Sequence, residues 1–218
     1  MAAGAPDQGR PGGDSDDGPT RRVNVDDPGR GAVTGLGESV AIGLIVAAKF
    51  VLPLLVLRFP FAAGWANFFL DSFDGDLLIP LGLPNDVYQP VDKVTDWVTY
   101  SAIVVFCFRH AWPTRRLMLV LFLYRSVGQI TFLVTGNELV LALFPNFLEP
   151  LFLVTITILT FERAIRRAVD WQERGFAVVH RYRWLIGSVI VVYKLIDEYI
   201  THVGNIDRSE LLQRLLGG

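Results

Sequence analysis

The sequence predicts an all-α fold, a polytopic transmembrane helical bundle of about five spans with a disordered N-terminal tail. Its 218 residues are 51% hydrophobic and only 19% charged, with a mean hydropathy of +0.39. Globular domains are nearer 45–50% apolar and about 25% charged. The apolar residues also gather into runs long enough to cross a bilayer, and the arginines gather between those runs on one predicted side. Together these features favour a membrane protein.

The first 38 residues are rich in Gly, Pro and Asp and hold few large apolar side chains. Such a segment cannot bury enough surface to offset its ordering entropy, so we predict a disordered tail over 1–38. Neither a basic start nor an apolar signal-peptide run precedes Val40, which places this tail in the cytoplasm. A single cysteine excludes a disulfide within the chain, and a net charge of −2 gives no support to a nucleic-acid partner.

The transmembrane domain is predicted over 39–202, followed by a short C-terminal tail at 203–218. About 20 helical residues cover the roughly 30 Å hydrocarbon core of a bilayer. Five segments approach this length: 39–58, 97–112, 117–135, 139–161 and 184–200. The apolar and aromatic segment 60–73 is shorter, about 14 residues, and is typical of an interfacial or re-entrant helix.

Orientation follows from the arginines, which prefer cytoplasmic loops. A cytoplasmic N-terminus places the arginines of 109–116 and 161–183 inside, in a plasma or inner membrane. The acidic segment 59–96 then forms an outer loop. The segment 161–183 is either a plain positive-inside loop or a basic interfacial helix lying on anionic lipid.

Ionisable side chains inside a span are costly, and they usually face the bundle interior with a partner or water. Lys49, Arg125 and Glu149 each lie about ten residues from a span end, which is about 15 Å deep. Arg125 and Glu149 fall at matching depth in adjacent antiparallel spans, so we predict that they form a buried pair. Lys194 and Glu198 share one helical face nearer the outer surface.

These residues predict an outward-facing intramembrane polar pocket. We expect it to bind a small solute, a lipid head group or a partner subunit; the alternative is a structural network that fixes helix register. The predicted pocket residues are Lys49, Arg125, Gln129, Asn146, Glu149, Lys194, Asp197 and Glu198.

Four carboxylates of the acidic loop have the spacing of candidate metal ligands. Asp71 and Asp74 precede Gly75, and Asp92 and Asp96 lie four residues apart at the start of the next span. Carboxylate oxygens are the ligands that Mg²⁺, Mn²⁺ and Ca²⁺ prefer. We therefore predict a divalent-metal site here, with solvated turns and helix caps as the alternative.

The same spacing resembles the signature of the CDP-alcohol phosphatidyltransferases, with Asp71, Asp74, Gly75, Asp92 and Asp96 at the matching positions. That resemblance implies a divalent-metal-dependent membrane enzyme that acts on a lipid or phosphoester, its aspartates binding metal and activating an alcohol. The chain departs from the signature at Leu78, Ile79 and Tyr88, where that family has an Ala-Arg pair and a second Gly. Residues that would hold the cytidine diphosphate are therefore missing. That family also has six spans and a cytoplasmic site, whereas the arginine bias puts this loop outside.

Overall fold

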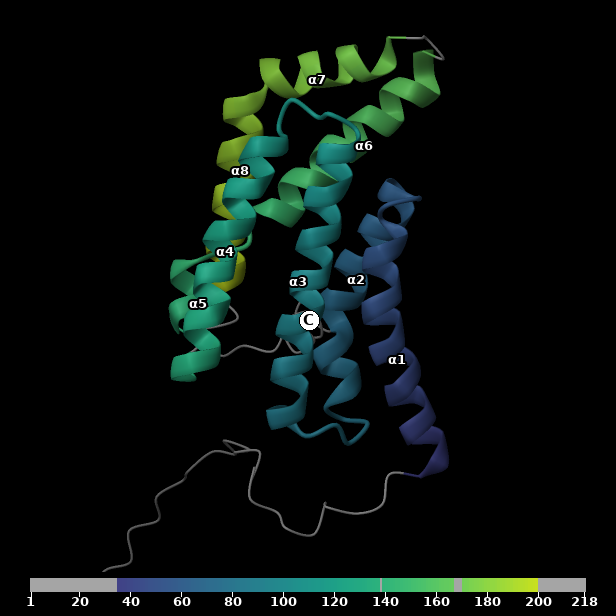
Figure 1. Cartoon of the computed structure of the whole chain (residues 1–218), viewed down its shortest axis with the longest axis vertical. Helices are drawn as coiled ribbons and strands as arrows, with labels where there is room; N and C mark the ends of the chain where they lie inside the picture. The colour runs from purple at the N-terminus through teal and green to yellow at the C-terminus, as the bar shows by residue number, and fades with distance from the viewer. Residues whose placement is uncertain (1–34, 138, 167–169, 200–218) are drawn as a thin grey trace, which may run out of the picture. The chain divides into compact units, whose positions relative to one another are not determined.

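A computed structural model describes residues 35–137, 139–166 and 170–199. These residues are helical apart from short connections, which confirms the all-α prediction for the part of the chain described. The predicted tails lie outside the described residues, except that 36–38 already belong to the first helix. The helices are α1 (Leu36–Leu55), α2 (Pro60–Leu78), α3 (Asn85–Arg109), α4 (Arg115–Thr135), α5 (Leu139–Leu143), α6 (Leu148–Arg166), α7 (Trp171–Arg181) and α8 (Arg183–Glu198) (Figure 1).

Within the described part of the chain, two helices, α1 and α4, are long and apolar enough to cross a membrane. The pair α7 and α8 meets the same test as one broken span, with a bend of 68° between its halves. On α1, Leu44, Val51 and Leu54 are more than half exposed. A continuous row of exposed aliphatic side chains is unfavourable in water, and it is the surface that lipid solvates.

The predicted acidic outer loop is instead mostly helical. Pro60 is the first residue of α2, where its fixed φ favours a helix start and its missing N–H breaks no helical bond. The helix runs past residue 73 to Leu78, and a turn containing Gly82 at φ 101° leads into α3. The aspartates of 59–96 therefore lie on two packed helices, because the apolar residues between them pack against the bundle.

The predicted span 139–161 is also interrupted, since it forms α5 and α6 with a break at 144–147. Pro145 lies in the break. Proline cannot donate the backbone hydrogen bond that would continue α5, so the helix ends before it. Pro150 lies in the first turn of α6, where helices tolerate proline.

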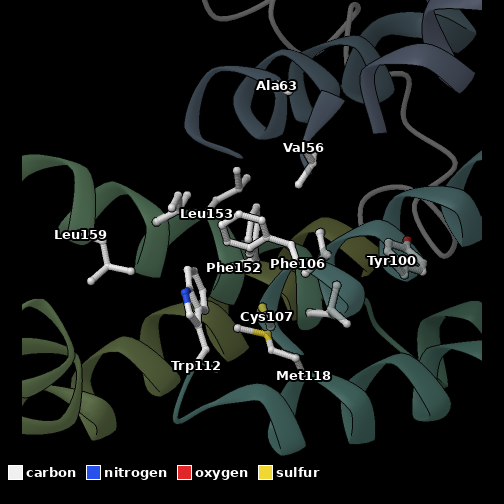
Figure 2. Packing of buried hydrophobic residues seen from close by; sticks show 13 residues of the cluster. Val56, Ala63, Tyr100, Phe106, Cys107, Trp112, Met118, Phe152, Leu153 and Leu159 are labelled. Carbon is white, nitrogen blue, oxygen red and sulfur yellow. The ribbon is translucent and has the colours of Figure 1, made fainter. Parts of the chain in front are cut away.

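An aromatic core fixes α3, α6 and α7 against one another (Figure 2). Phe152 of α6 lies 5.9 Å from Phe106 of α3 and 5.7 Å from Trp112, measured between ring centroids. Trp112 in turn contacts Phe176 of α7 at 5.3 Å. Edge-to-face and stacked aromatic pairs add to the burial of their apolar area. This core positions α3 and α6, two of the helices that carry acidic side chains of the cavity described below.

Candidate functional site

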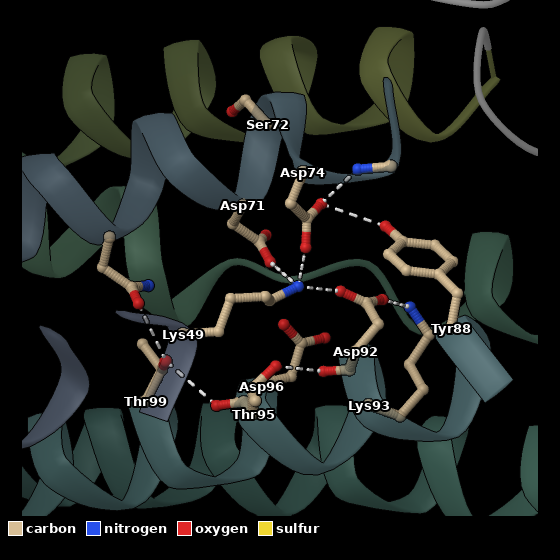
Figure 3. A network of polar contacts seen from close by, with 12 residues as sticks. Lys49, Asp71, Ser72, Asp74, Tyr88, Asp92, Lys93, Thr95, Asp96 and Thr99 are labelled. Carbon is tan, nitrogen blue, oxygen red and sulfur yellow. Dashed lines mark hydrogen bonds and ion pairs between the residues drawn. The ribbon is translucent and has the colours of Figure 1, made fainter. Parts of the chain in front are cut away.

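Lys49 is the centre of a buried ionic cluster (Figure 3). Its side chain extends from α1 and is only 3% exposed. The Nζ atom donates to Asp92 Oδ1 at 2.7 Å, contacts Asp74 Oδ2, and lies 3.5 Å from Asp71 Oδ1. Three helices therefore converge on one ammonium group.

The helical spacing of the aspartates explains why they meet. Asp71 and Asp74 are three residues apart on α2, and Asp92 and Asp96 are four apart on α3, so each pair shares a face. Helix α1 packs against both α2 and α3. Lys49 thus reaches the cluster from a third helix that packs on both acidic helices.

Two further side chains hold the cluster in place. Lys93 Nζ donates to the second oxygen of Asp92 at 2.6 Å, and the Tyr88 hydroxyl donates to Asp74 Oδ1 at 3.0 Å. Burial raises the pKa of Tyr88, and the nearby charge of Asp92 raises it further, so the phenol keeps its proton and remains a donor. Sequence reasoning missed both residues, although Lys93 adjoins a predicted ligand.

The Asp96 and Glu149 carboxylates accept hydrogen bonds from side-chain amides. Gln129 Nε2 donates to Asp96 Oδ2 at 2.9 Å. Asn67 Nδ2 and Asn146 Nδ2 donate to the two oxygens of Glu149, each at 3.3 Å. These amides orient the carboxylates and add no positive charge.

The expected pair between Arg125 and Glu149 is replaced by other contacts. Arg125 Nη1 donates to the carbonyl oxygens of Leu141 and Phe144, at 3.2 and 2.6 Å, and lies 3.7 Å from Glu198 Oε1. Matching depth did not bring the two residues together, because the guanidinium turns toward the end of α5 and toward α8.

Lys194 joins the site from α8. Its Nζ atom donates to Asp197 Oδ2 at 2.6 Å and lies 3.6 Å from Glu198 Oε1. Because Arg125 approaches the same Glu198 oxygen, two cations from different helices share one carboxylate. Glu198 therefore links α4 to α8 through Arg125 and Lys194.

These groups line one cavity of about 370 Å³. Nine of the ten acidic or basic residues predicted for the metal site and the intramembrane pocket line this cavity, together with Asn146. The tenth, Lys49, contacts Asp74 in the acidic wall of the cavity, and Gln129 donates to Asp96. The two predicted sites are therefore one. Tyr100, which sequence reasoning did not single out, also lines the cavity.

The cavity has an excess of acidic groups. Eight lining residues within the described ranges are acidic, and three are basic, namely Lys93, Arg125 and Lys194. Carboxylate oxygens of Asp71, Asp74 and Asp92 lie within 4.8 Å of one another, which is close enough for a shared cation. Four aromatic side chains also line the cavity: Phe68, Tyr88, Tyr100 and Tyr193.

Comparison of the chain with models of known protein families, with curated proteins and with solved structures finds no match. The function must therefore be argued from the geometry of the cavity.

Proposed function

We propose that the protein is an integral membrane protein, with about five spans and a cytoplasmic N-terminus, that binds a small positively charged ligand in its polar cavity. The ligand class is an organic ammonium compound, either a free amine or the amine of a lipid head group. The acidic excess of the cavity is the observation that carries this proposal.

Charge balance favours a cation. Eight lining carboxylates face three lining cations and Lys49. Carboxylates held this close in a low-dielectric site cannot all ionise unless protons or cations neutralise them. A bound ammonium group supplies that charge where the protein does not.

Cavity size and lining favour an organic cation. Small-molecule sites have volumes of about 300–1,000 Å³, and this cavity has about 370 Å³. Tyr88, Tyr100 and Tyr193 offer aromatic faces and edges beside the carboxylates. An ammonium group interacts favourably with an aromatic face as well as with a carboxylate. A bare metal ion would use only the carboxylates.

Thermal unfolding of the purified protein tests the proposal. Ethanolamine, choline and putrescine are added as chlorides, with NaCl at equal ionic strength as the salt control. A probe at a hundredfold excess over its dissociation constant stabilises the fold by about 2.7 kcal/mol. Nanodiscs with phosphatidylethanolamine or phosphatidylglycerol separate a lipid head group from a free amine.

Asp96→Asn is the matched test variant. The change removes one charge and keeps the shape. The buried Gln129 Oε1, which has no hydrogen-bond partner among the described residues, can accept from the new amide. We expect at least about a tenfold loss of probe affinity, about 1.4 kcal/mol. Glu173→Gln, on an exposed residue of α7, is the charge-matched control and leaves affinity unchanged. No stabilisation by any amine or amine lipid would refute the proposal.

A second candidate is a divalent-metal-dependent membrane enzyme that acts on a lipid or phosphoester. The close approach of the Asp71, Asp74 and Asp92 oxygens favours it. In this alternative the aspartates hold Mg²⁺, Mn²⁺ or Ca²⁺, and Arg125 and Lys194 hold the phosphate. Its test is stabilisation of the wild-type protein by one of these ions, lost in Asp74→Asn.

A further inference from the structure

We propose that Lys49 is a specificity-determining residue that occupies the cation position of the Asp71–Asp74–Asp92 cluster and thereby excludes divalent ions from it. The cavity is then left to a ligand with an ammonium group, a step that rests on the function proposed above.

The position of Nζ carries the first step. It contacts all three carboxylates, at 2.7 Å from Asp92 and 3.5 Å from Asp71, with Asp74 in direct contact (Figure 3). The three ligand oxygens lie within 4.8 Å of one another. A divalent ion bound to them would need oxygen distances of about 2.0–2.6 Å. It would occupy the volume of the ammonium group, so the ion and Nζ exclude each other.

The second step is that the surroundings of α1 outside the cluster are apolar and unfavourable for the Lys49 ammonium group. The residue is 3% exposed, whereas its α1 neighbours Leu44, Val51 and Leu54 present apolar surface to the outside of the bundle. Moving the ammonium group out of the cluster would place it in that apolar environment. The cost of an unpaired charge there keeps Nζ on the carboxylates.

The remaining acidic groups define where the ligand binds. Lys49 and Lys93 both contact Asp92, so the cluster on the α1 side already has two cations. Asp96 and Glu149 receive hydrogen bonds from neutral amides and line the cavity. A ligand cation therefore gains most beside these two carboxylates and not within the cluster.

The experiment is a Mn²⁺ titration, followed by electron paramagnetic resonance and thermal unfolding, of the wild-type protein and single variants. Lys49→Met keeps the length and apolar stem of the side chain and removes the charge. Lys194→Met is the matched control, because Lys194 is a partly buried cavity lysine that contacts Asp197 and not the cluster. We expect one Mn²⁺ to bind and stabilise Lys49→Met only, at least tenfold more tightly than wild type. Adding Asp74→Asn to Lys49→Met should abolish that binding.

Two results would overturn the proposal: tight Mn²⁺ binding by the wild-type protein that Asp74→Asn removes, or no gain of Mn²⁺ binding in Lys49→Met. If Lys49→Met unfolds on its own, recovery of the fold when it is purified with Mn²⁺ supports the proposal, and failure in both conditions overturns it. If the wild-type protein binds no amine but Lys49→Met gains Mn²⁺ binding, the proposed function is refuted and the exclusion of metal by Lys49 stands.

Discussion

Replacing Arg125 with Met should destabilise the protein by opening the break between α5 and α6. Pro145 has no N–H, so the carbonyl oxygen of Leu141 lacks the donor that a continuous helix would supply four residues on and accepts instead from the Phe144 N–H at 3.2 Å. Arg125 Nη1 supplies a second donor to Leu141, at 3.2 Å, and also binds the carbonyl oxygen of Phe144 at 2.6 Å. In an apolar environment such carbonyls must find partners inside the protein.

The magnitude follows from the number of bonds. A hydrogen bond to a charged group contributes about 1.5–3 kcal/mol, and Arg125→Met removes two of them. The variant also removes the cation 3.7 Å from Glu198 Oε1. Met retains most of the apolar contact of the Arg stem. We therefore expect the free energy of unfolding to fall by about 3–6 kcal/mol.

The assay is equilibrium unfolding of the detergent-solubilised protein. Arg174→Met is the matched control, because Arg174 forms an exposed i,i+4 pair with Asp170 in which both side chains are about half exposed. Exposed pairs contribute about 0–1 kcal/mol, so this control should lose little. An Arg125→Met loss no larger than that of the control would refute the reasoning.

A double variant isolates the role of the break. Pro145→Ala restores a backbone N–H that can donate to the Leu141 carbonyl, so the free energy of unfolding should depend less on Arg125. The combined loss of Arg125→Met and Pro145→Ala should then be smaller than the sum of the single losses. Additive losses would show that Arg125 stabilises the fold by some route other than the free carbonyls.

Two further predictions concern helix packing and orientation. Gly128→Ala should cost about 1–3 kcal/mol, because a Cβ there would lie 2.4 Å from the Cβ of Phe144. Gly187→Ala, where nothing lies within 4 Å, should instead stabilise by about 0.5–1 kcal/mol; similar effects in unfolding assays would contradict the close packing. In intact cells, an impermeant maleimide should label Ser72→Cys and not Gln172→Cys, and the reverse pattern would overturn the orientation.

The helices were predictable where local chemistry marks their ends. Pro60 marks the start of α2, and Gly136 adopts φ 67° directly after α4, a conformation that favours glycine. The predicted span 117–135 accordingly matches α4 to within two residues. A helix was predicted over 60–73, where Trp65, Phe68 and Phe69 pack together, and α2 covers that segment. The misread part is its acidic end, where aspartates were taken as turn residues although α2 continues to Leu78.

The sequence predicts which residues line the cavity better than it predicts which of those residues contact one another. Residue number within a span gives depth, so Arg125, Glu149 and Lys194 could be placed near one another. Depth says nothing about rotation around the helix axis or about which helices are neighbours. Lys49 therefore meets carboxylates 25 and 43 residues away, and Arg125 turns to the carbonyl of Leu141, whose helical donor is missing because position 145 in the break is proline.

The cavity can be a structural network and a binding site at once. Some of its charged side chains bind groups of the fold, as Arg125 binds carbonyl oxygens, whereas the Glu149 carboxylate accepts hydrogen bonds from neutral amides. Arg125 binds carbonyls that the break at Pro145 has freed, so its first contribution is to stability. The same break starts α6 at Leu148, where Asn146 Oδ1 accepts from the Glu149 N–H and the helix N-terminus favours the Glu149 carboxylate. The fold thus holds that carboxylate in place with a helix dipole and amides, and a cationic ligand is the partner that we propose for it.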